Sequence, residues 1–366
     1  MVSDRLNRIS AHRQALHRIP ELGYELEKTQ AYVLEVLSRT RAKVEVLSPS
    51  GALAYFDMGK ESTVALRADM DALPIEERTG LGYASAHPGC MHACGHDAHM
   101  AMLLAVCEEL DRTDAARNVL AVFQPAEEAG NGAMAVLRSG ALERYGVQEI
   151  YACHVEPSLP RGTIASRPGA LMAMASEVHV RAEGKSAHIA HADEGVDALR
   201  AGAEFLLAST DLVRKRYKDV MHLFGFGRFV SGTANNIISD ETRMDGALRA
   251  FDEDVFDSIR RDVLSVAREV SGRTGAAVHV DIPGGYPPLV NSEGCFRRLA
   301  EKADGLPFRV LEKPLLTTED FACYLKNVPG LMFLLGVESP HPLHSPFLSF
   351  GEECLLNGAE MFLRLI

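Results

Sequence analysis

Four short apolar runs decide the fold of this 366-residue chain: ALAYFD at 52–57, TVALR at 63–67, VLAVF at 119–123 and IYACH at 150–154. Each run is short and contains β-branched or aromatic residues, which is typical of a strand. A longer apolar segment at about 98–110 separates the first two runs from the last two and predicts a helix. Strands that alternate with helices favour an α/β sheet covered on both faces.

The pattern changes in the middle of the chain. Polar and apolar residues alternate in SEVHVR at 176–181, as they do in a half-buried strand. Further strands are predicted at 222–230 and 241–251, and helices at about 196–213 and 254–271. Together these elements predict a compact α+β unit of about 110 residues.

The last part of the chain returns to the first pattern. After GGYPP at 284–288, which is typical of a linker, helices and strands alternate again, with one helix predicted from Glu319. We therefore predict an α/β catalytic domain interrupted by an inserted α+β domain. The predicted boundaries are 1–170 and 284–366 for the two parts of the catalytic domain and 171–283 for the inserted domain.

Composition argues against several classes of function. Hydrophobic residues make up 47% and charged residues 24% of the chain, as in ordinary globular proteins. Acidic residues outnumber basic ones by 50 to 38, and the net charge of −12 opposes binding to nucleic acids. No window of about 18 residues lacks charge, so we expect no membrane span. The N-terminal stretch is charged throughout, so we expect no export signal there. Seven scattered cysteines indicate a reducing compartment, and we expect a cytoplasmic protein.

The strongest local signal is MHACGHDAH at 91–99. Cys94 and His96 lie two residues apart across a glycine, so in an extended or tightly turned backbone both side chains can reach one metal ion. His99 follows on the predicted helix, where it is better placed to support a ligand than to bind metal. The alternatives are a buried cysteine beside surface histidines and a nucleophilic Cys94. The two-residue spacing suits shared ligation better than thiol activation.

A second signal is FQPAEE at 123–128, at the C-terminal end of an apolar strand. Ligand sites of α/β sheets lie at such strand ends. The adjacent carboxylates of Glu127 and Glu128 repel each other unless a cation is near. Because neighbouring side chains point in different directions, one glutamate can bind metal while the other faces a reacting water. Two solvated loop glutamates are the alternative.

Other polar residues follow apolar strands in the same way. His154 ends IYACH, His344 follows an apolar strand predicted at 331–335, and Asp69 and Asp71 follow TVALR. The two aspartates are expected to share a face suited to orienting metal-bound imidazoles. Because all these residues fall at strand ends of one predicted sheet, we expect them to converge on one site.

Five motifs, taken together, resemble a known family. They are HRIPELG at 17–23, ALRADMDALP at 65–74, MHACGHDAH at 91–99, FQPAEE at 123–128 and GKSAH at 184–188. In this order, and followed by EDF at 319–321 and LH at 343–344, they resemble the amidohydrolase branch of the aminoacylase and carboxypeptidase-type metallopeptidases. That branch includes hippurate hydrolase, plant auxin-conjugate hydrolases and bacterial N-acetyldiaminopimelate deacetylase. The match runs nearly end to end.

The resemblance implies a two-metal catalytic domain built on a mixed sheet with helices on both faces, and an inserted lid domain that often dimerises. It implies metal ligands at Cys94, His96, Glu128, His154 and His344. Glu127 falls on the catalytic acid and base, and His188 in the lid falls on a histidine that binds substrate near its scissile carbonyl. Asn236 and Arg249 match lid positions that recognise the substrate carboxylate.

The resemblance also implies a reaction. We expect a hydrolase that cleaves the amide bond of a small N-acyl amino acid with two divalent ions, which are zinc, manganese, cobalt or nickel. The favoured substrate is N-acetyldiaminopimelate, in lysine biosynthesis. The open alternatives are a broader, hippurate-type amidohydrolase, a dipeptidase or carboxypeptidase, and a catalytically inactive metal-binding relative.

Two points bear on assembly and specificity. A homodimer through the inserted domain is expected, and whether His188 serves its own site or a partner's stays open. The chain departs from the family at Ala192-Asp193, where a Pro-His pair is usual, and at Thr318, where a glycine is usual. Both departures bear on substrate preference more than on the chemistry.

Overall fold

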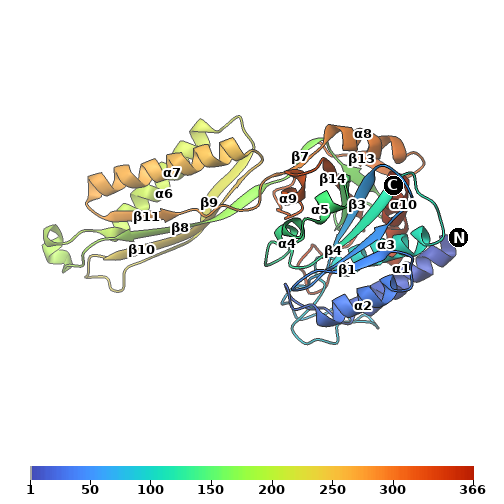
Figure 1. Cartoon of the computed structure of the whole chain (residues 1–366). Helices are drawn as coiled ribbons and strands as arrows, with labels where there is room; N and C mark the ends of the chain where they lie inside the picture. The colour runs from blue at the N-terminus through green and yellow to red at the C-terminus, as the bar shows by residue number, and fades with distance from the viewer. Residues whose placement is uncertain (1) are drawn as a thin grey trace. The chain divides into compact units, whose positions relative to one another are not determined.

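The structure is a computed structural model that describes residues 2–366 (Figure 1). The chain divides into two compact units. The larger contains the residues up to Leu171 together with Val290–Pro314 and Glu319–Ile366, and the smaller contains Met172–Leu289 and Leu315–Thr318.

The larger unit is built on a mixed sheet of eight strands in the order β1-β2-β4-β3-β5-β14-β6-β13. The strands are β1 (Lys43–Val46), β2 (Ala52–Phe56), β3 (Thr63–Asp69), β4 (Asn118–Gln124), β5 (Val147–Glu156), β6 (Ile164–Ser166), β13 (Phe308–Val310) and β14 (Gly330–Gly336). The inner strands β4, β3, β5 and β14 run parallel to one another, whereas β2 is antiparallel to β4 and β6 is antiparallel to β14. Every residue of β3, β4 and β14 is buried, which explains why their sequences are almost continuously apolar.

The helices of the larger unit cover both faces of this sheet. They are α1 (Val2–His17), α2 (Glu27–Leu37), α3 (His96–Leu110), α4 (Gly132–Arg138), α5 (Ala141–Arg144), α8 (Glu293–Lys302), α9 (Ala322–Leu325) and α10 (Leu355–Leu365). The chain passes from β3 through α3 to β4, and then back across β3 through α4 and α5 to β5. Because such crossovers are right-handed, this reversal puts α3 on one face and α4 and α5 on the other, as Figure 1 shows.

Helix α3 is the centre of the larger hydrophobic core. It is buried on nearly every side, from His96 to Cys107 and again at Leu110, with α1 and α10 packed against it. A helix that is apolar all round is stable only when it is enclosed in this way. The polar first turn of α3 is therefore buried as well, and it lies at the carboxyl ends of the parallel strands.

The smaller unit is a four-stranded antiparallel sheet with two helices. Its strands are ordered β11-β8-β10-β9, and its main elements are β8 (Met174–Glu183), α6 (Ala198–Arg216), β9 (His222–Ser231), β10 (Glu241–Ala250), α7 (Glu253–Thr274) and β11 (Ala277–Asp281). Alternate residues of β8, such as Val178 and Val180, are buried in the core under α6 and α7, while Glu177 and His179 are exposed on the open face. The side chains of Asp197 and Asp252 cap α6 and α7 by accepting backbone N–H groups of the first turn.

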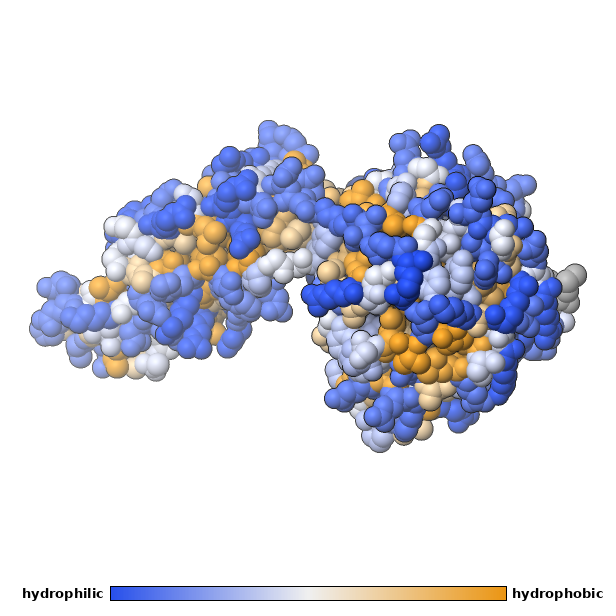
Figure 2. Space-filling view, in the orientation of Figure 1, coloured by the Kyte–Doolittle hydropathy of each residue, from blue (hydrophilic) through white to orange (hydrophobic). Residues whose placement is uncertain are grey.

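The predicted fold class, an α/β unit with a mixed sheet and helices on both faces plus an inserted α+β unit, is confirmed. The structure adds short strands that the sequence pattern did not indicate, among them β1, β11, and the separately paired β7 (Gly169–Met172) and β12 (Leu289–Asn291). The helix predicted from Glu319 begins only at Ala322, because the Glu319 side chain turns back to accept the Phe321 N–H. Figure 2 shows hydrophilic residues over most of the visible surface of both units.

None of the helices in residues 2–366 is long and apolar enough to cross a membrane.

Candidate metal centre

The residues singled out from the motifs of the larger unit gather at the carboxyl ends of its parallel strands. Asp69 ends β3, Glu127 and Glu128 follow β4, and His154 lies near the end of β5. His344 lies beyond β14, and its backbone N–H donates to the carbonyl of Ala93, which ties its loop to the segment that carries Cys94. In α/β folds, ligands bind at the sheet edge where successive crossovers leave in opposite directions, and this edge is such a place.

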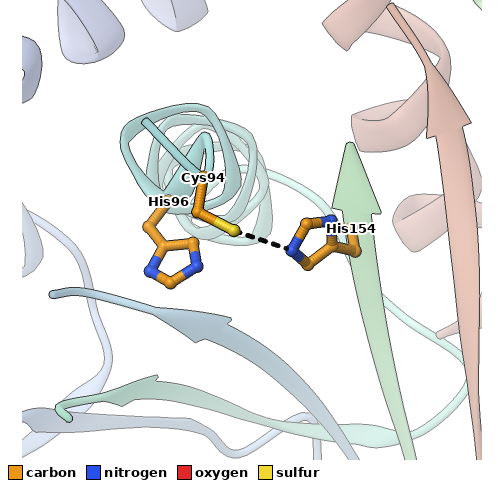
Figure 3. Close-up of side chains that lie close together, drawn as sticks. All are labelled: Cys94, His96 and His154. Atoms are coloured by element: carbon orange, nitrogen blue, oxygen red, sulfur yellow. Dashed lines mark hydrogen bonds between the residues drawn. The ribbon is translucent and has the colours of Figure 1, made fainter. Parts of the chain in front are cut away.

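A single glycine sets the relation between Cys94 and His96. Gly95 has φ of 87°, and a Cβ atom there would lie 2.5 Å from Cγ2 of Val155. Only glycine satisfies both the left-handed backbone and the close approach. The turn places the Cys94 thiol at the start of α3, with Sγ 3.5 Å from Nε2 of His154 on β5 (Figure 3).

Of the five groups of donor atoms that the described residues form, two share Cys94. One consists of Cys94, His96 and His154, and the other of Cys94, Glu128 and His344, with all donor atoms of a group within 4.8 Å of one another. Oε1 of Glu128 lies 3.4 Å from Nε2 of His344 and 3.9 Å from Nε2 of His96. The sulfur of Cys94 therefore belongs to both groups, and all five predicted ligands meet in one place.

The electrostatics of these donors fit a cation. Among the described residues, Nε2 of His96 and Oε1 of Glu128 are buried polar atoms without a hydrogen-bond partner, which is costly unless something else binds them. Burial raises the pKa of the Cys94 thiol well above its ordinary value, so a thiolate here needs a nearby positive charge. A thiolate, imidazoles and a carboxylate are the donors that divalent transition metals take.

The imidazole rings are oriented by bonds from their other nitrogen. Nδ1 of His96 donates to the carbonyl of Asp71 at 2.8 Å, and Nδ1 of His154 donates to the carbonyl of Val155 at 2.7 Å. In the neutral form of each ring Nε2 is then the unprotonated atom, and this is the form that binds metal.

His99 is engaged through both of its nitrogens. Nδ1 donates to Asp69 at 2.6 Å and Nε2 accepts the Val155 N–H at 3.0 Å. Burial lowers the pKa of His99 to about 4, so the ring is neutral. His99 and Asp69 thus support the centre and supply no free donor to it.

Asp71 is used differently from the sequence expectation. Its two carboxylate oxygens accept the successive backbone N–H groups of Glu127 and Glu128, at 2.9 and 3.0 Å. The nearest ring atom is Nδ1 of His96, 3.7 Å from Oδ1. It is the backbone carbonyl of Asp71, and not its side chain, that orients the imidazole, because the residue lies just beyond the end of β3.

The two adjacent glutamates differ in proton affinity. Burial, together with the neighbouring carboxylates of Glu319 and Asp320, raises the pKa of Glu127 well above its ordinary value. Burial acts in the same direction on Glu128, but the nearby rings of His344, 3.4 Å away, and His96 overcome it and lower the pKa. When the surroundings shift the pKa values of two neighbouring carboxyl groups in opposite directions, the two groups are suited to different roles.

The sequence motifs did not single out Arg67, although it lies next to the candidate metal centre. Arg67 is buried in β3 and its guanidinium lies 2.6 Å from Asp69, 3.0 Å from Glu319 and 3.0 Å from Asp320. Its Nε also donates to Gln124 at 3.0 Å. The signal was present in the sequence, since an arginine inside an otherwise apolar strand must have buried acceptors.

Three predicted site residues belong to the smaller unit. His188 is exposed, and its Nδ1 accepts the Ala190 N–H at 3.1 Å. The Ile189 N–H donates to the carbonyl of the exposed Asn236 at 3.0 Å, so the His188 and Asn236 segments are neighbours. Arg249 lies on β10 and its guanidinium donates to the carbonyl of Leu316.

Comparison with known proteins identifies the family. The model of peptidase family M20/M25/M40 matches residues 65–366, and the chain belongs to this family. A protein of Ligilactobacillus salivarius named N-acetyldiaminopimelate deacetylase is 35% identical over 360 residues, which cover 96% of this chain and 94% of that protein. One of the same name from Streptococcus uberis is 38% identical over 353 residues, 93% of each chain.

A solved structure extends the comparison. A Bacillus subtilis protein described as a dinuclear metal binding peptidase from the M20 family superposes with a TM-score of 0.88, at 28% identity and over 99% of this chain and 98% of its own. The predicted family, the predicted amide-bond hydrolase and the predicted two-metal centre are confirmed by these relatives together with the two donor groups.

Proposed function

We propose that this protein is an N-acetyldiaminopimelate deacetylase, which hydrolyses an N-acetyl amide to acetate and a free amine. The observation that carries the proposal is the overlap of two metal-donor groups on Cys94, with Glu127 beside them. The choice of substrate is supported by relatives of that name at 35% and 38% identity.

The five donors divide between two ions. One would be held by Cys94, His96 and His154, and the other by Cys94, Glu128 and His344. When bound, two divalent ions would lower the pKa of the reacting water and polarise the substrate carbonyl. The donor set suits zinc, and manganese, cobalt and nickel also bind such donors.

Glu127 moves the proton. It accepts a proton from the attacking water and gives that proton to the amide nitrogen as the C–N bond breaks. The products are acetate and the free amine. Its raised pKa suits this exchange, because a carboxylate with a raised pKa accepts a proton from water more readily. Glu128 has a lowered pKa and stays ionised as a ligand.

Residues of the smaller unit recognise the substrate in this proposal. Because Nδ1 of His188 already accepts a hydrogen bond, the neutral ring carries its proton on Nε2 and offers it to a carbonyl oxygen. Arg249 retains guanidinium N–H groups beyond the one directed at Leu316 and would pair with a substrate carboxylate, with Asn236 beside it as a further polar contact.

Two isosteric substitutions of adjacent residues test the roles. Glu127→Gln is expected to lower kcat by about 10²–10⁴-fold while the protein keeps both metal ions, since only the proton carrier is lost. Glu128→Gln is expected to lose one ion, because an amide is a poor ligand. Metal content by atomic spectroscopy and kcat measured on both variants check this, and near wild-type turnover by metal-loaded Glu127→Gln would refute the role of Glu127.

A substrate panel tests the specificity. N-acetyldiaminopimelate, hippurate and a dipeptide are supplied to the metal-loaded enzyme, and kcat/KM is expected to be highest for the first. A preference for hippurate would favour the broader amidohydrolase, and a preference for the dipeptide would favour a dipeptidase. Metal binding without turnover of any of the three would favour the inactive relative.

We further propose that the enzyme works in the cytoplasm and as a homodimer through the smaller unit. All seven cysteines are buried thiols, which suits a reducing compartment. Strand β9 is an edge of its sheet and exposes Leu223, Phe229 and Val230, which a second copy would cover. Sedimentation analysis of the wild type and of Val230→Lys would check the dimer.

A further inference from the structure

The EDF motif at 319–321 enters the chemistry above only through the charges of Glu319 and Asp320, and it also lies against the loop that carries Glu127. This loop, residues 125–131, joins the end of β4 to the start of α4. An aspartate in this motif contacts both ends of the loop. The inference that follows rests on the proposed role of Glu127.

Asp320 accepts hydrogen bonds from both sides of the loop. Its Oδ1 and Oδ2 each lie 2.9 Å from Nε2 of Gln124, the last residue of β4, and Oδ2 accepts the N–H of Ala133, in the first turn of α4, at 2.9 Å. Nη2 of Arg67 donates to Oδ1 at 3.0 Å. Asp320, Gln124 and Ala133 are all 0% exposed, so no water replaces these bonds.

Gln124 is itself held in one orientation. Its Oε1 accepts from Nε of Arg67 at 3.0 Å and from the hydroxyl of Tyr324 at 2.9 Å, which leaves Nε2 for Asp320. The carboxylate thus completes a buried network in which every donor has an acceptor.

The loop between these two anchors is tight and strained. Ala126 and Asn131 are not glycines, yet they have φ of 51° and 54°. The loop ends almost touch, because a Cβ atom on Gly132 would lie 1.6 Å from the carbonyl oxygen of Pro125. Such a backbone persists only when its surroundings hold it in place.

We propose that Asp320 is a positioning residue for Glu127: by bonding both ends of the 125–131 loop, it fixes where the Glu127 carboxylate lies relative to Cys94, His96 and Glu128. Arg67 supplies the positive charge that this buried carboxylate needs. Asp320 does not touch the substrate in this role, so it acts on kcat through Glu127.

The decisive variant is Asp320→Asn. All its partners are donors, so an amide of the same shape must turn its NH₂ group either toward the N–H of Ala133, which releases the α4 end of the loop, or toward Nη2 of Arg67, which breaks the charged contact that holds Asp320 in place. We expect kcat to fall by about 10–100-fold, as a misplacement near 1 Å does, with KM within about twofold and both metal ions retained. In a Glu127→Gln background the same substitution is expected to have no further effect on kcat, since it acts through the missing group.

A matched control lies at the other end of β4, the strand that ends at Gln124. Asn118, at the start of β4, is buried and holds the loop before β3 through bonds with Met58 and Lys60. Asn118→Ala is expected to lower stability to urea while kcat stays at the wild-type value. Gln124→Met removes only one anchor and serves as the second variant if Asp320→Asn does not fold, with an expected loss in kcat of the same kind.

Amide hydrogen exchange on the metal-free protein gives a readout that does not depend on turnover. Asp320→Asn is expected to speed exchange at residues 126–133 and not at the Asn118 end of β4. Unchanged kcat and unchanged exchange in Asp320→Asn would overturn the inference, and so would a full additional loss of kcat in the Glu127→Gln background. A wild-type enzyme that turns over none of the panel substrates would refute the proposed function alone, and the exchange result would then decide the positioning role.

Discussion

Two histidines, each placed between two carboxylates, show how differently the two units use charge. In the larger unit His17 lies 2.8 Å from Asp97 and 3.3 Å from Glu77, with its side chain 2% exposed. In the smaller unit His179 lies 3.0 Å from both Asp245 and Glu177, with its side chain 47% exposed. The chemical groups match, and only the surroundings differ.

The same contrast holds for the arginines. Arg67 is surrounded by three buried carboxylates, whereas Arg228 meets Asp245 on the open face of the smaller sheet, with side chains 64% and 41% exposed. A buried charge without its partner is very unfavourable, so buried pairs set geometry strictly. An exposed pair is screened by water and salt and contributes little. We therefore expect the charged groups around the metal centre to fix positions, and those of the open face to keep a surface hydrated.

The largest expected effect tests the buried side of this comparison. Arg67→Met leaves Asp69, Glu319 and Asp320 without their cation, and we expect the free energy of unfolding to fall by about 3–5 kcal/mol. Urea unfolding of both proteins, followed by circular dichroism, measures it. A loss below about 1 kcal/mol would mean that burial does not separate the two classes of charge.

An intermediate effect depends on pH. Burial alone would lower the pKa of His17, but Asp97 and Glu77 raise it to about 9 from an ordinary 6.5. Because the folded state holds this proton more tightly, its stabilisation is complete below pH 6.5 and is lost as the pH rises to about 9. The shift corresponds to a change on the order of 3 kcal/mol.

Urea titrations between these pH values compare the wild type with two matched variants. The fall in stability is expected to disappear in His17→Gln and to persist in His179→Gln. The pKa of His179 is also raised, by the hydrogen bond with Asp245, but at an exposed site. A slope that survives in His17→Gln would contradict the assignment.

The smallest expected effect comes from the open face. Arg228→Ala removes one of the two partners of Asp245, the other being His179, and we expect the free energy of unfolding to change far less than in Arg67→Met. The difference should shrink further in about 1 M salt, where the screening length is short. A loss as large as that of Arg67→Met would mean that exposed and buried charge pairs contribute equally to stability.

Much of the fold could be predicted because local pattern and burial agree. The apolar runs that became β3, β4, β5 and β14 are buried on both sides, and a strand so enclosed needs a continuous apolar sequence. Short edge strands have no such requirement. Strand β1 has only four residues, none of them buried, and its sequence carries little sign of its structure.

In the candidate site, the sequence indicated the metal-binding side chains but not the residues that support them. The motifs place Cys94, His96 and Glu128 at strand and helix ends, where residue type and position together indicate metal, and the structure brings these side chains together. The supporting network was beyond sequence reasoning, because Arg67 and Asp320 are 253 positions apart and meet only through the packing of the whole unit. Asp71 likewise holds two backbone amides, a use that no side-chain pattern reveals.

That grip of Asp71 has a mechanical consequence. One carboxylate bonds two consecutive peptide groups, so Glu127 and Glu128 are anchored at a common point. When the loop fluctuates, Glu127 and Glu128, the proposed proton carrier and the proposed metal ligand, are expected to move together. Alignment of the reacting groups then survives thermal motion that would spoil it if the two side chains came from separate segments.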